Sequence, residues 1–428
     1  MSSDAISRIL DGIPIPPMAR IRQHLPEETL PDVAAAARTA MDREVLRKKI
    51  RPGMRVAITA GSRGIFGMKD MLREAAAFVR SCGGDPFLIP AMGSHGGATA
   101  DGQRDVLTRY GITEETVGAP IRATMETVKI GELPDSTPVY IDRYAAEADG
   151  IILVNRIKCH TGFRGRYESG LFKMMAIGLG KQYGAQTVHG RGADKMGESI
   201  ELFGKAILQN ANVLLGLAVI ENAIDMPYQI VALTPQEIID QEPDYLTLAR
   251  QLMPRILFDN LDVVIVDYFG KEISGAGVDP NVTHTYKYAS GIPLDGRARQ
   301  VAVLDLTEQS HGNAHGVGVM DLITKRFFDK IDPDITYANS LTTGGTEVPK
   351  IPMYLPNQRM CIQAAIHCAQ GADRVKLRMV RIRDTMHLKE IQVSPALLEE
   401  ARGNPAFDIL EEPTPLVFDS QGDLFPSK

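Results

Sequence analysis

The chain has 428 residues and a net charge of −6, from 47 Lys and Arg against 53 Asp and Glu. A chain of this length can bury a large core and is expected to form about two or three domains. No basic block and no apolar run of about 18 residues occurs, which argues against nucleic acid as the main partner and against a membrane-spanning helix. The start of the chain has no signal-peptide pattern and the four cysteines are scattered, so a cytoplasmic protein with free thiols is expected.

The first half of the chain is predicted to alternate strands with helices. Short apolar runs at residues 55–60, 86–92 and 149–154 are typical of buried strands. Glycine-rich loops follow the first two runs, and helical patterns at 68–80 and 101–110 come next. This order predicts a mostly parallel sheet that is covered by helices on both faces.

The second half repeats this pattern after a boundary near residues 255–260. Strands are expected at 261–267 and 300–306, a helix at 318–329, and a surface segment from Gly403 onward. The sequence therefore predicts an α/β protein with two domains, residues 1–255 and 256–428. Each would hold a mostly parallel sheet flanked by helices, with the active site in the cleft between them.

The first candidate site is the loop that follows the strand at 55–60. In open parallel sheets, ligands bind beyond the carboxyl ends of the strands. The sequence Gly61-Ser62-Arg63-Gly64 leads into a helix, whose free N–H groups suit a phosphate or carboxylate. Arg63 could add a bidentate contact to such an anion. The alternative is an ordinary turn with a surface arginine.

Three histidines, His95, His160 and His189, lie in glycine-rich segments past strands or helices. His95 stands between Ser94 and two glycines, where an accessible imidazole could transfer protons near neutral pH. A single loop histidine is more often a structural hydrogen-bonding residue, so the position alone leaves both interpretations open.

The segment 155–181 is locally basic in an acidic protein, which favours an anionic ligand. Lys173 lies in an apolar helical stretch, where it either extends its ammonium to the surface or is desolvated and acts as a nucleophile. His189 follows sixteen residues later. One continuous helix would separate the two by about 24 Å. Glycines at 178, 180 and 184 predict a break in this helix, which would allow the chain to turn and bring His189 back toward Lys173.

Together these residues resemble the nickel-dependent lactate racemase family, over roughly residues 50–255. The resemblance is carried by Arg63 in the first loop, Gly93-Ser94-His95 in the second, His160-Thr161-Gly162-Phe163, Lys173 and His189.

The resemblance implies a racemase or epimerase of a 2-hydroxy acid, an isomerase that works by reversible hydride transfer. The cofactor would be a nickel-pincer nucleotide, pyridinium-3,5-bisthiocarboxylic acid mononucleotide with Ni, attached to Lys173. His189 would complete the square-planar geometry that suits Ni(II). The nucleotide phosphate would lie near Ser62 and Arg63. His95 and His160 would act as acid and base on the two sides of the substrate.

The departures from the family indicate a divergent member. The first loop has Ala60-Gly61-Ser62 where the family commonly has Asp-His-Thr, and the second domain, on the substrate side, matches poorly. There Lys271 could contact a substrate carboxylate, and the loop at 342–350 could line the cleft. His311 and His315 would form a metal pair only on a helix, which their glycine-rich surroundings disfavour.

The expected partners are a small anionic 2-hydroxy acid and the enzymes that make and insert the cofactor, with no nucleic acid and no membrane. Oligomeric state stays open. Two other functions are possible. One is a lyase or hydrolase that uses His95, His160 and His189 as a three-histidine zinc site. The other is a non-catalytic protein that binds an anion or nucleotide on the same scaffold.

Overall fold

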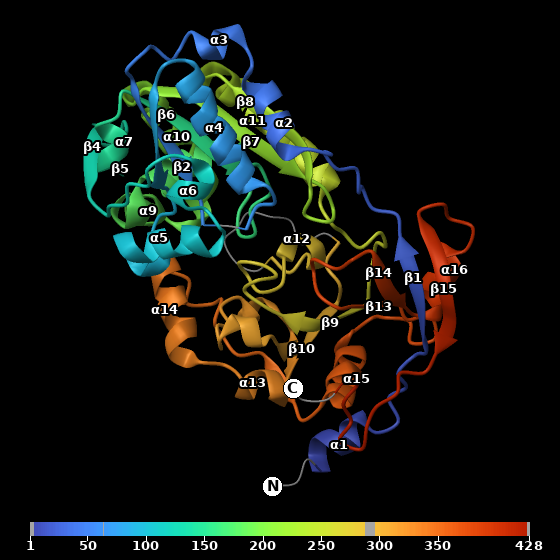
Figure 1. Cartoon of the computed structure of the whole chain (residues 1–428). Coiled ribbons are helices and arrows are strands. Elements are labelled where there is room, and N and C mark those ends of the chain that lie inside the picture. Colours follow the sequence, from blue (N-terminus) through green and yellow to red (C-terminus); the bar gives the residue numbers. More distant parts are fainter. Residues whose placement is uncertain (1–3, 63, 287–295, 426–428) are drawn as a thin grey trace. The chain divides into compact units, whose positions relative to one another are not determined.

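The computed structural model describes residues 4–62, 64–286 and 296–425 (Figure 1). It divides into two compact units: residues 26–253 form the N-terminal unit, and residues up to Leu25 join those from Pro254 onward in the C-terminal unit. Across the described residues, no helix is both long enough and apolar enough to cross a membrane.

The N-terminal unit contains a five-stranded sheet in the order β3-β2-β6-β7-β8. Its first four strands are parallel, and β8 is antiparallel to β7. The strands are β2 (Arg55–Ala60), β3 (Asp85–Pro90), β6 (Gly150–Arg156), β7 (Val213–Glu221) and β8 (Pro227–Leu233). A separate two-stranded ribbon pairs β4 (Thr127–Glu132) with β5 (Pro138–Asp142). The expected parallel sheet is confirmed.

Helices cover both faces of this sheet. The longer ones are α2 (Val33–Met41), α4 (Met68–Ser81), α5 (Ala100–Arg109), α9 (Lys181–His189), α10 (Met196–Asn210) and α11 (Pro235–Leu252). The shorter ones are α3 (Glu44–Arg47), η1 (Gly96–Ala98), α6 (Glu114–Val117), α7 (Arg143–Ala146), α8 (Leu171–Lys173), η2 (Met174–Leu179) and η3 (Ala193–Lys195).

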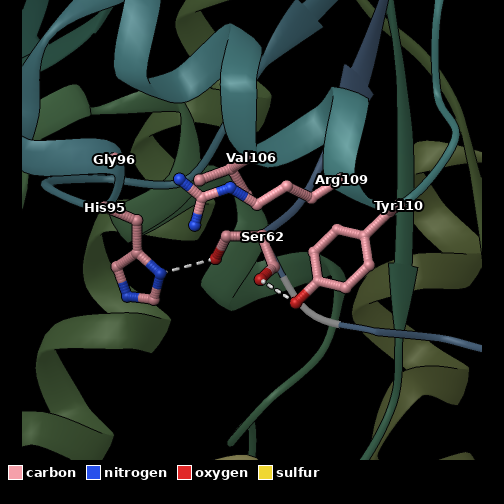
Figure 2. Close-up of a pocket in the computed structure, with 6 residues that line it drawn as sticks. All are labelled: Ser62, His95, Gly96, Val106, Arg109 and Tyr110. Atoms are coloured by element: carbon pink, nitrogen blue, oxygen red, sulfur yellow. Dashed lines mark hydrogen bonds between the residues drawn. The ribbon is translucent and has the colours of Figure 1, made fainter. Parts of the chain in front are cut away.

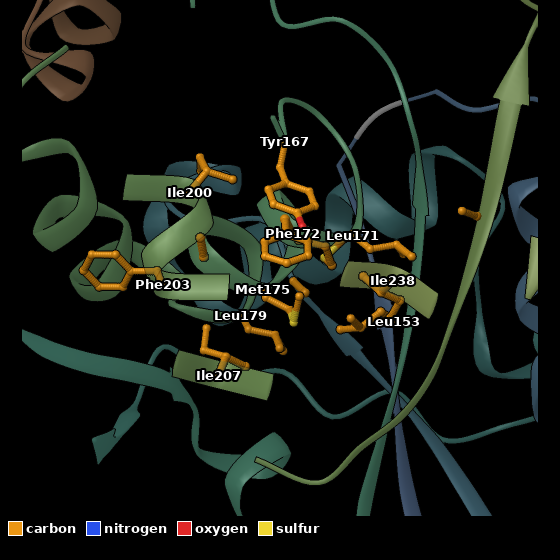
Figure 3. Close-up of a cluster of buried hydrophobic side chains, with 14 of the residues drawn as sticks. Leu153, Tyr167, Leu171, Phe172, Met175, Leu179, Ile200, Phe203, Ile207 and Ile238 are labelled. Carbon is orange, nitrogen blue, oxygen red and sulfur yellow. The ribbon is translucent and has the colours of Figure 1, made fainter. Parts of the chain in front are cut away.

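The sheet divides the core of this unit into two parts, and successive side chains of β6 pack in one part and then in the other. Leu153 packs in a cluster with Phe172 and the apolar side of α10 (Figure 3). Its neighbours Ile152 and Val154 belong to a second cluster, with α2 and α4. Since successive side chains of a strand point to opposite faces, the two clusters lie on the two sides of the sheet. Strands buried on both faces explain why their sequences are continuous apolar runs.

The order of these strands creates a position suited to ligand binding. From β2 the chain moves to β3 on one side, and later returns to β6 on the other side of β2. The connections that leave β2 and β6 therefore diverge at the carboxyl ends of these strands. Ligands of open α/β sheets bind at such a switch point.

The C-terminal unit holds an eight-stranded sheet in the order β12-β11-β10-β9-β13-β14-β1-β15. The first five strands are parallel and the remainder pair antiparallel. The strands are β1 (Met18–Gln23), β9 (Val263–Phe269), β10 (Gln300–Leu306), β11 (Leu322–Thr324), β12 (Met353–Leu355), β13 (Met379–Ile382), β14 (Glu390–Val393) and β15 (Phe407–Thr414). Its helices are α1 (Asp4–Leu10), α12 (Pro280–Thr283), η4 (Glu308–Ser310), η5 (Val317–Val319), α13 (Lys325–Asp329), α14 (Pro333–Thr343), α15 (Gln358–Cys368) and α16 (Pro395–Ala401).

Two expectations for this unit differ from the structure. The first residues of the chain do not lie with the N-terminal unit, because β1 hydrogen-bonds between β14 and β15. The segment from Gly403 lies mostly at the surface, as expected, and it also contains β15, the edge strand beside β1. The helix expected at 318–329 is wrong: β11 occupies its middle, a short 3-10 turn, η5, lies at its start, and α-helix is found only at its end, in α13. Pairing of β11 with β10 and β12 outweighs the local helical pattern.

Candidate functional site

Loops from β2 and β3 meet at the switch point, against the helical segment that carries Lys173. A Cβ on Gly61, just after β2, would lie 3.5 Å from Cε of Met174. The Gly93 N–H, after β3, donates to the Gly178 carbonyl at 3.3 Å. The Asn155 amide, near the end of β6, donates to the Gly170 carbonyl at 2.7 Å. The segment from α8 through η2 therefore lies at the carboxyl ends of all three strands.

His95 and Ser62, predicted from separate loops, are brought together here. Ser62 Oγ and His95 Nδ1 are 2.6 Å apart and hydrogen-bonded. The Tyr110 hydroxyl donates to the Ser62 carbonyl at 3.3 Å. These residues border a pocket of about 330 Å³ that is lined by Ser62, His95, Gly96, Val106, Arg109 and Tyr110 (Figure 2). The predicted Arg63 lies outside the described residues.

A buried polar network holds the His95 loop from behind. Gln103 Nε2 donates to the carbonyls of Gly93, at 2.8 Å, and of His95, at 3.2 Å. Lys181 Nζ donates to Gln103 Oε1 at 2.9 Å and forms an ion pair with Asp142 Oδ2 at 3.0 Å. The side chains of Lys181 and Asp142 are both 0% exposed. Burial raises the pKa of Asp142 and lowers the pKa of Lys181, and each shift is opposed by the charge of the other residue.

His160 is held by backbone contacts and by a buried carboxylate. Its ring stacks on Phe163 with centroids 4.1 Å apart, and its Nδ1 accepts the Gly162 N–H at 3.0 Å. The His160 N–H donates to Glu168 Oε2 at 2.7 Å. Burial raises the pKa of Glu168, whereas this N–H and the nearby Arg164 oppose that rise. The loop around His160 is therefore fixed in position by a carboxylate beneath it.

Lys173 and His189 lie within electrostatic reach of each other. Lys173 ends α8, the chain continues through the π-helical turn η2, and α9 ends at His189. The expected break is present: Lys181 has φ of 53°, in the left-handed region that a non-glycine residue rarely adopts. Burial lowers the pKa of His189, and the charge of Lys173 lowers it further. His189 is nevertheless exposed to solvent.

Glu242 on α11 positions the start of the Lys173 helix. Its side chain is buried, and Oε2 accepts the Phe172 N–H at 3.2 Å. A Cβ on Gly170 would lie 2.1 Å from Glu242 Oε1, so only glycine permits this close approach. Burial raises the pKa of Glu242 to about 8.

Glu242, Lys181, Gln103 and Arg109 were not predicted from the sequence as residues of the site. A signal existed for Glu242, since its spacing from Ile238 and Leu246 puts it on the buried side of α11. No local pattern pointed to Arg109, which becomes relevant only when α5 lies beside the loop after β2.

Lys271 belongs to the C-terminal unit. Its ammonium donates to the carbonyls of Gly275 and of His315, the latter at 3.3 Å. The His315 ring is hydrogen-bonded to Ser340 Oγ at 2.8 Å, and burial lowers its pKa to about 4. His311 and His315 lie in turns and not on a helix, so they do not form the i, i+4 metal pair. The loop expected at 342–350 begins inside α14.

The three histidines do not form a joint metal site. Among the residues that the structure describes, which include His95, His160 and His189, no group of three His, Cys, Asp or Glu could hold a metal ion. The three-histidine zinc site considered above is therefore not formed.

Comparison with known proteins gives one sequence match. Residues 19–201 match the family model described as the lactate racemase N-terminal domain. No curated protein sequence matches the chain. A solved protein from Thermotoga maritima, a structural genomics target, has 13% identity and a TM-score of 0.47, over 85% of this chain and 99% of its own. The lactate racemase apoprotein from Thermoanaerobacterium thermosaccharolyticum has 13% identity and a TM-score of 0.44, over 92% of this chain and 97% of its own. At these scores neither structure supports an argument about function.

Proposed function

Residues 19–201 of this chain match the model of the lactate racemase N-terminal domain, and from this premise we propose that the protein racemises or epimerises a 2-hydroxy acid. Lys173 and His189 would hold a nickel-pincer nucleotide, while His95 and His160 would exchange protons with the substrate hydroxyl. The observation that carries the proposal is the position of Lys173 at the end of α8, in the helical segment at the switch point of the sheet, with His189 at the end of the helix that follows this segment.

The residues at this position fit the proposed cofactor. A primary amine at the end of α8 and an imidazole at the end of α9 are present, one able to form a covalent link and the other able to bind a metal. Both influences on His189 favour its neutral form, and neutral imidazole is the metal-binding form. Gly61 and Gly93 let the loops after β2 and β3 pack closely against the helical segment that carries Lys173. When bound, the group would supply an electron-accepting centre for reversible oxidation of the carbinol carbon.

His95 is suited to moving a proton in either direction. Its Nδ1 contacts the Ser62 hydroxyl, which can rotate to donate or to accept. Either tautomer of His95 is therefore supported, and Nε2 can take the proton of a substrate hydroxyl or return it. Ser62 holds the ring orientation in both cases.

His160 is constrained differently. Its Nδ1 accepts the Gly162 N–H, which places the proton of the neutral ring on Nε2. In this geometry His160 donates from Nε2 to a substrate oxygen. Accepting a proton there requires the bond to Gly162 to break, so we expect the two histidines to contribute unequally to the two directions of the reaction.

The test is to co-express the full chain with enzymes that synthesise the pincer cofactor, to supply nickel, and to measure intact mass and metal content. We expect a mass increase at Lys173 and one nickel per chain, both lost in Lys173→Ala. Lys195→Ala, which alters an exposed lysine nearby, serves as the matched control. Loaded protein is then screened for loss of optical activity with 2-hydroxy acids.

Two results would contradict the proposal. The first is wild-type protein without adduct and without nickel under these conditions. The second is full nickel content and full activity in Lys173→Ala. If the loaded protein bound 2-hydroxy acids with unchanged affinity in a His95→Ala and His160→Ala double variant, and turned none of them over, a non-catalytic binding protein would be the better description.

A further inference from the structure

The pocket beside His95 contains an arginine that the proposed function does not use. Arg109 is the last residue of α5, and its exposed side chain lines the pocket with Ser62 and His95. Figure 2 shows the guanidinium directed toward the hydrogen-bonded pair of Ser62 and His95. A long, flexible cation in this position can reach a ligand that touches the imidazole.

Arg109 has no protein partner within residues 4–62, 64–286 and 296–425: the structure shows no hydrogen bond and no ion pair from its guanidinium there. Arg104, on the same helix, does have protein partners. Arg104 donates to the Ile121 carbonyl at 2.9 Å and lies 3.8 Å from a Glu114 oxygen. One arginine of α5 is thus used to hold the fold, and the other is available to a ligand.

The remaining polar groups in the pocket match an anion. Ser62 and Tyr110 contribute hydroxyl groups, His95 contributes an imidazole, and none of the lining residues that the structure describes is acidic. A guanidinium binds carboxylate or phosphate through paired, charge-assisted hydrogen bonds, which are stronger than neutral ones. A bound anion therefore meets no repulsion from the described lining residues.

We infer that this pocket is an anion subsite, in which Arg109 binds a carboxylate or phosphate group next to His95. The site itself does not depend on the proposed function, but its role does. The anion would be either a second acidic group of the substrate, which makes the substrate a dicarboxylic or phosphorylated 2-hydroxy acid, or the phosphate of the nucleotide cofactor.

The subsite is tested first on the full-length apoprotein, by calorimetric titration with inorganic phosphate and with malonate at constant ionic strength. Arg109→Gln is expected to weaken binding of these anions about tenfold or more, as the loss of hydrogen bonds to a charged group implies. Arg104→Gln makes the same change of charge on the same helix and is expected to bind as wild type does. Equal binding by wild type and Arg109→Gln, or no binding by wild type, would overturn the inference.

The source of the anion is tested on protein loaded with cofactor. If the substrate supplies it, Arg109→Gln keeps its nickel and raises KM for dianionic 2-hydroxy acids, with little change for monoanionic ones. If the cofactor supplies it, the nickel content and the mass adduct fall in Arg109→Gln whatever the substrate. Unchanged loading and unchanged KM would overturn both assignments. Failure of wild type to load would instead reject the proposed function and leave the apoprotein result standing.

Discussion

The two sides of the His95 loop differ in how their polar groups are satisfied. Behind the loop, the charges of Lys181 and Asp142 are fully buried and paired, and Gln103 links them to the backbone of His95. In front of it, Arg109 and Tyr110 are exposed and line an open pocket. Burying a charge is costly unless it is paired, whereas an exposed charge costs the fold little. The rear side therefore maintains the geometry, and the front side is available for binding.

The largest effect on stability is expected for Lys181→Met. Removal of the ammonium leaves the Asp142 carboxylate buried without a counter-ion, and we expect a loss of about 3–5 kcal/mol in the free energy of unfolding. Denaturant unfolding of the full chain measures it. Lys205→Met removes an exposed partner of Glu201 and should cost less than about 1 kcal/mol.

A second substitution tests the cause of this loss of stability. If the penalty comes from the stranded carboxylate, adding Asp142→Leu to Lys181→Met should restore part of the lost stability, because the unpaired buried charge is then removed. A Lys181→Met variant as stable as wild type would show that the rear network does not hold the fold in the way described.

On the front side, His95→Gln should lower activity and leave stability almost unchanged. We expect racemisation by the loaded enzyme to fall about 100-fold or more, as is typical when a general acid or base is removed. The free energy of unfolding should change by less than about 0.5 kcal/mol, since the side chain is exposed. His24→Gln, at an exposed position of the C-terminal unit, is the control for activity. Retention of full activity in His95→Gln would exclude its catalytic role.

Another buried group, Glu242 beside the start of α8, is expected to make stability depend on pH. Its pKa in the folded protein is about 8, above the ordinary value of 4.5. Between these two values the folded state binds more protons than the unfolded state, so stability falls as pH rises, by up to about 1.4 kcal/mol per pH unit. Glu242→Gln keeps an acceptor for the Phe172 N–H and should flatten this slope, as measured by denaturant unfolding from pH 5 to 8.

Glu198→Gln, at an exposed position of α10, should leave the slope unchanged. If the wild type and Glu242→Gln gave parallel stability profiles over this range, the buried carboxyl would not be protonated in the folded protein, and its role at the start of α8 would be that of a charged group.

The smallest effect is expected for Ser62→Ala. The hydrogen bond to His95 lies at an open surface, so its loss should change the free energy of unfolding by less than about 0.5 kcal/mol. Activity should fall about tenfold or less, because the imidazole loses its orientation but keeps its proton chemistry. Racemisation rates of Ser62→Ala and His95→Gln, measured side by side, test the predicted loss of activity. A loss as large as that of His95→Gln would place Ser62 in direct contact with the reacting atoms.

Much of the N-terminal unit could be predicted from the sequence because the relevant signals are local. Strands buried on both faces are apolar runs, so β2, β3 and β6 were identified close to their observed limits. Glycines past these strands marked the loops of the site, and the glycines around Lys181 marked the break between η2 and α9. Each of these features depends on residues within one or two turns of the chain.

Only the tertiary structure decided which distant residues become partners. Local periodicity indicates that Glu242 faces the core, but it does not show that the core there is the first turn of α8. The pairing of β1 with β14 and β15 joins opposite ends of the chain, and no pattern in 18–23 specifies those strands. Arg109 acquires its position only when α5 packs beside the loop after β2. A sequence pattern reports which side of an element is buried, whereas the neighbour on that side is determined by topology and packing.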